Sequence, residues 1–257
     1  MTTKHRRRMD CFQDGQRVRK KEKKKGKTMR VVTFAGAHAC GKTAVIMKAV
    51  QNLKEQGIHA AVMKLDCISS EDDKIYERAG ITTVKYLSGN TCPDHFFVQS
   101  IEQAYAWARE RGADMLVTES AGLCGRCSPH IRDIPAVCVI DCLSGISAPF
   151  KIGPMLWYAD YVVITKGDLV SPTEREIFLY NVKKANRKAR VFFVNGLNGQ
   201  GIYKLDQILQ TTGEIQAITD KYLRFTMPAA VCTYCAGQTK VGGNDAVTRI
   251  KAGMLEE

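Results

Sequence analysis

The sequence predicts an α/β fold, in which a mostly parallel sheet carries helices on both faces. From Met29 onward, short runs rich in β-branched residues alternate with helical stretches; this alternation is typical of parallel sheets covered by helices. The segment GAHACGKT, at residues 36–43, stands between the first run and the first helical stretch, where a phosphate-binding loop belongs. The 257 residues are 45% hydrophobic and 25% charged, which is enough for a sizeable core. These features place the chain among the P-loop NTPases.

The expected elements follow in chain order. The apolar run RVVTF at 30–34 predicts the first strand, and a helix over 43–56 follows it, with Gly57 as its left-handed stop. Later strands are expected wherever short apolar, largely β-branched runs occur, at 59–65, 83–87, 115–118, 136–140, 161–164 and 191–194. Helices are expected in the segments between strands, at 71–78, 93–111, 173–188 and 202–209. In the longest, an apolar stripe at helical spacing is formed by Phe97, Ile101, Tyr105 and Ala108.

The formal charge of +12 is concentrated at the N-terminus. Residues 1–28 hold 12 Lys and Arg against 3 Asp and Glu, whereas the rest holds 26 against 23. The first segment therefore reads as a basic, disordered tail, and the nearly balanced remainder makes nucleic acid an unlikely partner of the folded part. The alternation of strands and helices stops near residue 220, so we expect one domain over 29–220 and a small cysteine-containing appendage over 221–257.

The sequence excludes several classes of protein. No run of about 18 apolar residues occurs, so we expect no membrane insertion, and no secretory leader is visible, so we expect a cytoplasmic protein. Ten cysteines are many for such a chain, and two Cys-x-x-Cys pairs are among them. In this setting metal or redox chemistry is the better prediction than a disulfide framework.

The segment at 36–43 fits the pattern Gly-x-x-x-x-Gly-Lys-Thr. Its glycines let backbone N–H groups surround phosphates, and the start of the following helix adds partial positive charge. Lys42 is expected to reach the β- and γ-phosphates, and Thr43 to offer its hydroxyl to Mg²⁺. The side chains of His38 and Cys40 are expected to point outward. The residues assigned to nucleotide binding here are Gly36, Ala37, His38, Ala39, Cys40, Gly41, Lys42 and Thr43.

Two further strand ends carry polar residues suited to a nucleotide. Glu119 ends an apolar strand, which is the Walker B arrangement, and is expected to hold Mg²⁺ or to polarise the attacking water. Gly122 would let its backbone N–H approach the γ-phosphate.

The sequence ITKGD ends another strand with a carboxylate. The Asp168 carboxylate can accept hydrogen bonds from guanine N1–H and its amine, whereas adenine N1 would repel it, so GTP is favoured over ATP. Lys166 would lay its aliphatic stem on the base. Many GTPases carry Asn where this chain has Thr165, so the base-reading motif departs from the usual one at that position. Asn195 follows the next strand and could close over the base.

Together these motifs resemble the HypB/UreG-type nickel-chaperone GTPases of hydrogenase and urease maturation, with the cobalamin-linked zinc-chaperone GTPases as relatives. The Glu-x-x-Gly sequence at 119–122, KLDCISSED at 64–72, SGNTCPDH at 88–95 and NGLNGQGI at 195–202 carry the resemblance, which covers roughly residues 29–212.

The resemblance implies a GTPase domain over 29–220 in which Asp66 and Glu119 serve Mg²⁺ and hydrolysis, and Thr165, Lys166 and Asp168 read guanine. It also implies that Cys92 and His95 bind metal, that the protein is a homodimer, and that it delivers metal to a client metalloenzyme or its accessory proteins. Asp94 lies between Pro93 and His95, which departs from the family's pattern.

The cysteine pairs add candidates for a transition metal, either nickel or zinc, or for an iron–sulfur cluster. Cys124 and Cys127 follow Glu119-x-x-Gly122, where a metal would be close to a nucleotide-sensitive switch, and His130 is a further candidate ligand. Cys232 and Cys235 are candidates to complete a four-thiolate site with that pair. A redox disulfide in either pair stays an alternative.

Four functions are compatible with these features of the sequence. The first is a dimeric GTP-hydrolysing metallochaperone, with nickel as the favoured cargo. The second is a dimeric iron–sulfur switch that passes electrons on nucleotide hydrolysis. The third is a basic adaptor that binds RNA or an anionic membrane through residues 1–28. The fourth is a small-molecule kinase, which Asp168 disfavours because kinases rarely need guanine selectivity.

Overall fold

The computed structural model describes residues 28–68, 71–89, 91–123, 125–225 and 240–241. Within them lies one eight-stranded sheet. Its strands are β1 (Met29–Gly36), β2 (Ala60–Asp66), β3 (Thr82–Leu87), β4 (Met115–Glu119), β5 (Ala136–Asp141), β6 (Tyr161–Thr165), β7 (Arg190–Phe193) and β8 (Glu214–Ile215). The order is β3-β2-β4-β1-β5-β6-β7, all in parallel pairs, and only β8 runs antiparallel, beside the start of β1. The predicted α/β fold with a mostly parallel sheet is confirmed.

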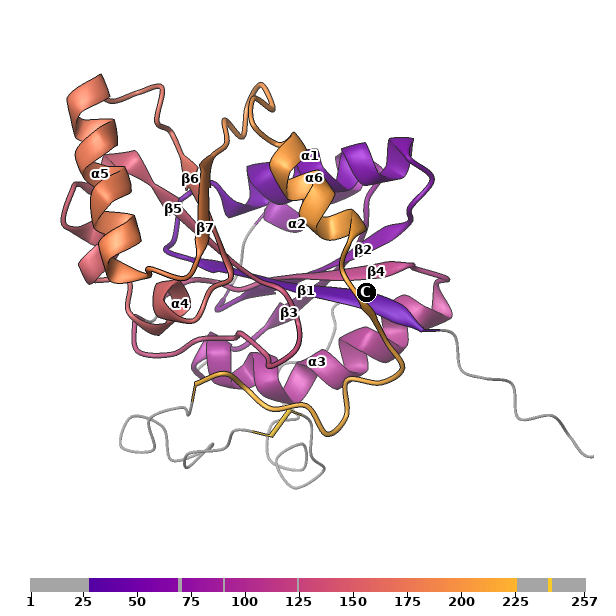
Figure 1. The fold of residues 1–257 in the computed structure, drawn as a ribbon. Helices are drawn as coiled ribbons and strands as arrows, with labels where there is room; N and C mark the ends of the chain where they lie inside the picture. The colour runs from indigo at the N-terminus through magenta and orange to yellow at the C-terminus, as the bar shows by residue number, and fades with distance from the viewer. Residues whose placement is uncertain (1–27, 69–70, 90, 124, 226–239, 242–257) are drawn as a thin grey trace, which may run out of the picture.

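Helices cover both faces of the sheet (Figure 1). They are α1 (Lys42–Glu55), α2 (Asp72–Arg78), α3 (Pro93–Glu110), α4 (Pro154–Trp157), α5 (Pro172–Ala185) and α6 (Tyr203–Gln210), with short 3₁₀ turns η1 (Cys142–Ser144) and η2 (Ala148–Phe150). In Figure 1, α1, α2 and α6 lie on one side of the central strands, and α3 and α4 lie on the other. The α5 helix packs at the β6–β7 end of the sheet.

Local sequence explains where the helices begin and end. Gly57 has φ +78° just past α1, so it is the expected left-handed stop. Ser171 and Glu174 form a capping box at the start of α5, where each side chain bonds the other's backbone N–H. Pro93 occupies the first turn of α3 after Cys92, a position where proline's missing N–H costs nothing.

The core divides between the two faces because side chains alternate along each strand. Val32, Val62 and Val117 pack with α1 and α6 on one face. Ala61 and Leu116 pack with α3 on the other face. The central strand β1 is buried along nearly its whole length, so the loop that follows it rests on a rigid support.

Four short elements were not expected from the sequence. The α4 helix spans four residues and β8 spans two, and neither length is enough to show a periodicity. The two 3₁₀ turns follow β5 in a segment with no apolar repeat. None of these elements changes the order of the parallel strands.

The two predicted end segments fall largely outside the described residues. The basic tail, including Cys11, lies there except for Thr28, and of the predicted appendage only 221–225 and 240–241 are described. Those residues pack closely on the domain: Leu223 and Val241 are buried in the core cluster that includes α3, and Arg224 forms two hydrogen bonds of 2.7 Å to the Asp160 carboxylate. Among the described helices, none has the length and apolar character that a membrane span requires.

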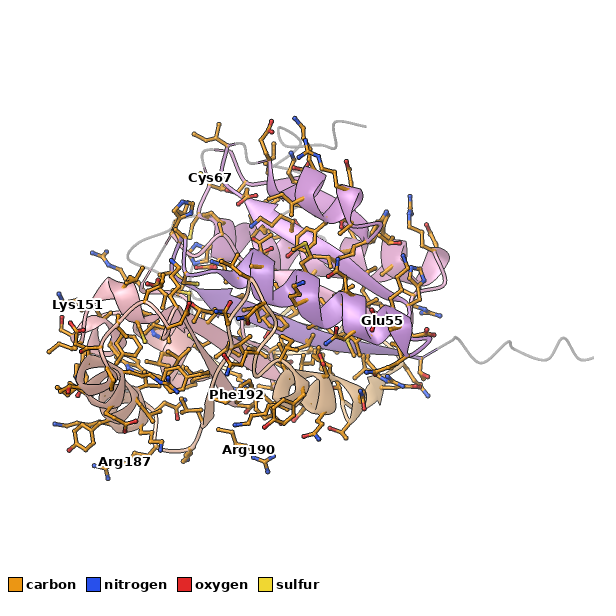
Figure 2. All side chains as sticks on the ribbon, turned by 90° about the horizontal axis from the view of Figure 1, so that it is seen from above. Glu55, Cys67, Lys151, Arg187, Arg190 and Phe192 are labelled. Atoms are coloured by element: carbon orange, nitrogen blue, oxygen red, sulfur yellow. The ribbon has the colours of Figure 1, made fainter. Side chains whose placement is uncertain are left out.

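The carboxyl ends of the parallel strands meet at one edge of the sheet. Viewed from above, Cys67, directly after β2, lies near this edge, and Glu55, at the C-terminus of α1, lies toward the opposite end (Figure 2). In open parallel sheets, ligands bind outside the carboxyl ends of the strands. The polar residues predicted from the sequence therefore converge at the expected edge.

Candidate functional site

The loop between β1 and α1 has the backbone shape of a phosphate-binding loop. Gly36 has φ +147°, and a Cβ there would stand 2.0 Å from the Val139 carbonyl oxygen, so only glycine fits. Gly41 has φ +89° at the start of α1. The Lys42 ammonium folds back over the loop and donates hydrogen bonds of 3.0 and 2.8 Å to the carbonyls of Gly36 and Ala37.

A cavity of about 700 Å³ opens beside this loop. Its volume lies within the usual range for small-molecule sites. It brings together polar residues from four separate segments, namely the loop, α1, β2 and β4. The polar lining residues include His38, Lys42, Thr43, Lys64, Asp66, Cys67 and Glu119.

Glu119 is the most enclosed carboxylate of this cavity, with 1% of its surface exposed. Its Oε1 accepts hydrogen bonds from Thr43 Oγ1 at 2.7 Å and from Lys64 Nζ at 2.8 Å, and its Oε2 accepts one from the Tyr76 hydroxyl at 2.7 Å. Neither Lys64 nor Tyr76 was expected to take part in this site. A signal was present, since Lys64 interrupts an otherwise apolar strand, but its partner on β4 could not be inferred without the strand order.

Thr43, Asp66 and Glu119 offer the oxygen ligands that Mg²⁺ prefers. The Thr43 hydroxyl and the Glu119 carboxylate are already in contact, and Asp66 lies 3.8 Å from the same Lys64 ammonium that Glu119 binds. These three residues fit a divalent cation at the phosphate end of the cavity.

Gly122 lies against the phosphate-binding loop. It has φ +73°, and a Cβ there would stand 1.9 Å from the Gly36 carbonyl oxygen. Ser120 donates its backbone N–H to the Phe34 carbonyl at 3.0 Å, which holds the start of the same segment on β1. The chain after β4 is therefore packed directly on the loop that would carry phosphate.

The residues predicted to read the base divide into two groups. Thr165 is buried and donates a hydrogen bond of 2.6 Å to the Cys40 carbonyl, so it supports the phosphate-binding loop from beneath. Lys166 has φ +55° and lies along the edge of the loop, where its ammonium donates a hydrogen bond of 2.8 Å to the Ala39 carbonyl.

A second cavity, of about 280 Å³, is where Asp168 and Asn195 meet. Arg175 lies in the same cavity with its guanidinium 4.4 Å from the centre of the Phe193 ring. The Asn195 Oδ1 accepts the backbone N–H groups of Leu197 and Asn198 at 2.9 and 3.2 Å, which fixes the loop that bounds the cavity.

One expectation about the phosphate-binding loop is wrong. His38 is exposed as expected, but the Cys40 side chain is 1% exposed and packs in the core beneath the loop. Burial raises the pKa of its thiol and keeps it protonated. Cys40 therefore behaves as a small apolar residue. Cys138 and Cys142 are likewise buried, whereas Cys67 is half-buried and lines the larger cavity.

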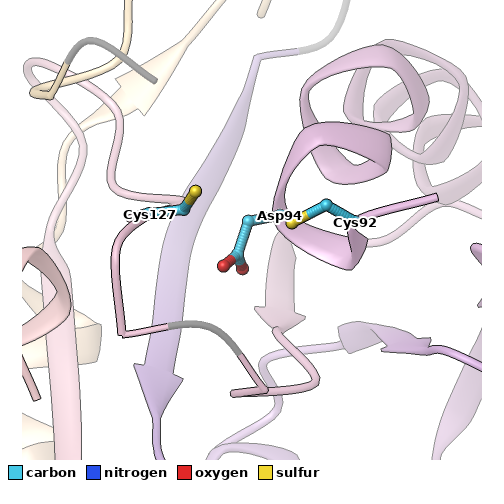
Figure 3. Close-up of side chains that lie close together, drawn as sticks. All are labelled: Cys92, Asp94 and Cys127. Atoms are coloured by element: carbon cyan, nitrogen blue, oxygen red, sulfur yellow. The ribbon is translucent and has the colours of Figure 1, made fainter. Parts of the chain in front are cut away.

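Cys92, Asp94 and Cys127 converge in one cluster on the α3 side of the sheet (Figure 3). Their two sulfur atoms and a carboxylate oxygen all lie within 4.8 Å of one another. Cys92 and Asp94 come from the start of α3, and Cys127 comes from the segment after Gly122. Within the described residues this is the one group of at least three Cys, His, Asp or Glu ligand atoms at such spacing.

The electrostatics of this cluster suit a cation. Hydrogen bonding from Cys127, together with the backbone N–H groups of Asp94 and His95, lowers the pKa of Cys92 to about 4, against the opposing effect of burial. Burial raises the pKa of Asp94 to about 7, and one of its oxygens is buried without a hydrogen-bond partner. A thiolate beside a carboxyl group with an unused oxygen fits a metal with mixed sulfur and oxygen ligation.

The two histidines predicted as ligands differ. His95 is buried beside Cys92, neither of its ring nitrogens has a hydrogen-bond partner, and it lies outside the 4.8 Å cluster. His130 is fully engaged elsewhere: its Nδ1 lies 2.9 Å from Thr33 Oγ1, and its Nε2 lies 2.9 Å from the Met155 carbonyl. Burial lowers the pKa of His130 to about 4. His130 is thus a core residue, and the expectation that it is a ligand is wrong.

Asp94 was not predicted as a partner of the two cysteines, because it was interpreted as a departure from the family's pattern. A signal was present: Asp94 stands two residues after Cys92 at a helix start, so its carboxylate is close to that cysteine. The predicted ligands Cys124, Cys232 and Cys235 lie outside the described residues.

Comparisons with known proteins place the chain in a family. The family model described as the CobW/HypB/UreG nucleotide-binding domain matches residues 28–193, and the chain belongs to that family. An uncharacterized protein of Methanocaldococcus jannaschii is 40% identical over 83% of this chain and 91% of its own length. The urease accessory protein UreG 2 of Bradyrhizobium sp. is 28% identical over 70% of this chain and 89% of its own.

Two solved structures share the fold. The hydrogenase maturation factor HypB from Archaeoglobus fulgidus has a TM-score of 0.56 at 20% identity, covering 71% of this chain and 89% of its own. HypB from Helicobacter pylori, in complex with nickel, has a TM-score of 0.57 at 19% identity, covering 73% and 87%. The chain is therefore a P-loop nucleotide-binding protein of the CobW/HypB/UreG family.

Proposed function

We propose that this protein is a GTP-hydrolysing metallochaperone, which binds a transition metal and delivers it to a client metalloenzyme or that enzyme's accessory protein. The observation that carries the proposal is a single short segment that joins two sites. Residues 119–127 begin at Glu119 in the nucleotide cavity, pass Gly122 against the phosphate-binding loop, and reach Cys127 in the metal cluster.

At the nucleotide end, Lys42 and the loop's N–H groups bind the phosphates of GTP. Thr43, Asp66 and Glu119 hold Mg²⁺, which when bound neutralises developing charge on the phosphate oxygens. The Glu119 carboxylate orients the attacking water or the ligands around it. Asp168 accepts the guanine N–H groups in the smaller cavity, which disfavours ATP.

At the other end, Cys92, Cys127 and Asp94 bind the metal as cargo. Two sulfur ligands with one carboxylate suit nickel, zinc or cobalt better than magnesium or calcium. Nickel is favoured, because the relative UreG 2 is a urease accessory protein and the Helicobacter pylori HypB structure is a complex with nickel. A homodimer would bring two such sets together, and His95 is placed to add a nitrogen ligand.

Hydrolysis would act on the metal through the shared segment. Loss of the γ-phosphate changes what Gly122 and Glu119 contact, and this displacement is carried over a few residues to Cys127. Gly125 lies closer to Cys127, and Gly153 packs directly against it: a Cβ at Gly153 would stand 2.3 Å from the Gly125 carbonyl oxygen.

The alternative is a dimeric iron–sulfur switch. Cys92 and Cys127 supply two thiols per chain, so two chains would supply the four thiolates that such a cluster takes. The Asp94 carboxylate beside the two cysteines favours the metallochaperone, because an iron–sulfur cluster is usually held by thiolates alone.

The test is elemental analysis with acid-labile sulfide on the full chain purified without oxygen, together with GTP and ATP hydrolysis. The proposal expects nickel, zinc or cobalt at up to one equivalent per chain, no sulfide, and GTP hydrolysis that is lost in Lys42→Ala. Iron with sulfide would instead support the electron-transfer switch. Absence of GTP hydrolysis with and without added nickel would overturn the GTPase assignment.

A further inference from the structure

Lys64 is a buried cation inside the nucleotide site. It lies on β2 directly in register with Glu119 on the neighbouring parallel strand β4, so both side chains leave the sheet on the same face. Lys64 is 3% exposed and Glu119 is 1% exposed, and the ammonium and carboxylate are 2.8 Å apart. A charge pair this deep is not a solvated surface contact.

The pair has a specific geometry around Glu119. Thr43 and Tyr76 supply neutral donors at 2.7 Å, and Lys64 supplies the positive charge. Removal of a carboxylate from water is costly unless a counter-charge and hydrogen bonds replace the water. Lys64 therefore holds the Glu119 carboxylate in contact with the Thr43 hydroxyl before any other cation is present.

Lys64 also changes the charge that an incoming cation meets. Two carboxylates, Glu119 and Asp66, face the phosphate end of the cavity, and the Lys64 ammonium lies 2.8 Å from the first and 3.8 Å from the second. Without Lys64 these groups would present a charge of −2, whereas with it they present −1. The same ammonium lines the cavity, so it also attracts the phosphates of a nucleotide that arrives without metal.

We propose that Lys64 is a positioning residue that acts as an internal counter-ion in the Mg²⁺ site. It holds Glu119 on Thr43, favours nucleotide binding in the absence of Mg²⁺, and limits the additional affinity that Mg²⁺ contributes. The proposal rests on the nucleotide site of the proposed function and requires neither hydrolysis nor metal delivery.

The test compares nucleotide affinity with and without Mg²⁺ in the full chain. The dissociation constant of a fluorescent GTP analogue is measured in EDTA and in millimolar Mg²⁺ for the wild type and Lys64→Met. Loss of one unit charge several ångströms from the phosphates predicts about tenfold weaker binding in EDTA. It also predicts about a tenfold larger ratio between the two affinities, because the cation then meets a more negative site.

Three variants separate this role from a structural one. Lys64→Arg keeps the charge and is expected to keep the affinity ratio within about twofold of the wild type. Lys85→Met is the matched control: Lys85 is the register neighbour of Lys64 on β3 and pairs with Asp73 at 2.7 Å. Its removal is expected to leave both affinities unchanged. Tyr76→Phe removes a neutral donor from Glu119 and is expected to leave the ratio unchanged.

A double variant keeps the test decisive if Lys64→Met fails to fold. Lys64→Met combined with Glu119→Gln removes one positive and one negative charge, so the net charge of the site equals that of the wild type. Under the proposal, the affinity of this double variant in EDTA returns to within about threefold of the wild type. An unchanged affinity ratio in folded Lys64→Met would overturn the proposal, and so would a double variant whose affinity in EDTA stays about tenfold weak.

The same titrations are run with a fluorescent ATP analogue. A preference for ATP, or GTP binding without hydrolysis, would contradict the proposed GTPase function. In both cases the titrations still show whether Lys64 sets the Mg²⁺ dependence of nucleotide binding. Failure of the Lys64 proposal is therefore distinguishable from failure of the proposed function.

Discussion

Gly122 packs so closely on the Gly36 carbonyl oxygen that a Cβ at Gly122 would stand 1.9 Å from it. This contact links the segment that carries Cys127 to the loop that would bind phosphate. A side chain at Gly122 cannot be accommodated without moving one of these two backbones. The contact is therefore the point where the chain leading to Cys127 meets the phosphate-binding loop.

Gly122→Ala is expected to weaken both nucleotide binding and the fold. The clash adds to the cost of a left-handed backbone, and together they are expected to lower the free energy of unfolding by more than about 2 kcal/mol. Denaturant unfolding and nucleotide titration measure the two effects. Gly112→Ala is the matched control, because Gly112 has φ +72°, close to the +73° of Gly122, with open space around it. Equal losses in the two variants would contradict the importance of the contact.

Asp168→Asn is expected to reduce the preference for GTP over ATP by at least tenfold, because the amide cannot accept both guanine N–H groups. Xanthosine triphosphate, which carries a carbonyl where guanine has its amine, should gain affinity, since the new amide can donate to it. Competition binding of the three nucleotides measures the change. Asp133→Asn, at an exposed position outside both cavities, serves as control. An unchanged preference for GTP would remove Asp168 from base recognition.

His130 is expected to make the fold sensitive to acid. Its folded-state pKa of about 4 lies below the ordinary value of 6.5, so the folded chain binds fewer protons than the unfolded chain between these two pH values. The contribution of His130 to the free energy of unfolding is fully present above about pH 6.5. It decreases by about 3 kcal/mol as the pH falls from there to about 4.

Urea unfolding from pH 7.5 to 4.5 tests this loss. His130→Gln should flatten the pH dependence in that window, although it lowers stability at pH 7.5 by disturbing the bonds to Thr33 and Met155. The exposed His38→Gln should keep the wild-type slope. The same slope in His130→Gln and in the wild type would show that other groups cause the acid sensitivity.

Cys127→Ser and Cys92→Ser are each expected to weaken binding of nickel by about 10- to 100-fold while leaving nucleotide affinity unchanged. Both residues supply sulfur to the cluster, and neither lines the nucleotide cavity. Isothermal titration with nickel, and separately with the nucleotide, measures the two affinities. Cys142→Ser is the control, since Cys142 is buried away from the cluster. Nickel affinity that survives both substitutions would place the metal elsewhere.

The sequence predicted the parallel sheet and the phosphate-binding loop because both depend on local patterns. The β-branched runs and the spacing of Gly36, Gly41 and Lys42 are visible without knowing which strands are neighbours. The segment at 119–122 was identified for the same reason. Each lies within a few residues of a strand end, so its position relative to the sheet follows from parallel topology alone.

What the sequence could not predict depends on contacts across the sheet. Lys64 reaches Glu119 only because β2 and β4 are neighbours in this register, and Tyr76 joins them from α2. Cys92 was expected to pair with His95, three residues further along the chain, yet the structure brings it to Cys127 and Asp94. Burial was equally hidden at Cys40 and His130, whose sequence neighbours suggested exposed or ligating roles.

The most direct test of the account measures the nickel affinity of the full chain with Mg²⁺ and a non-hydrolysable GTP analogue, and again with GDP. Coupling through the segment from Glu119 to Cys127 predicts at least a fivefold difference in affinity between the two nucleotide states, the lower end of ordinary allosteric coupling. The difference should vanish in Cys127→Ser. Equal nickel affinity in both states of the wild type would contradict the account, because the two sites would then act independently.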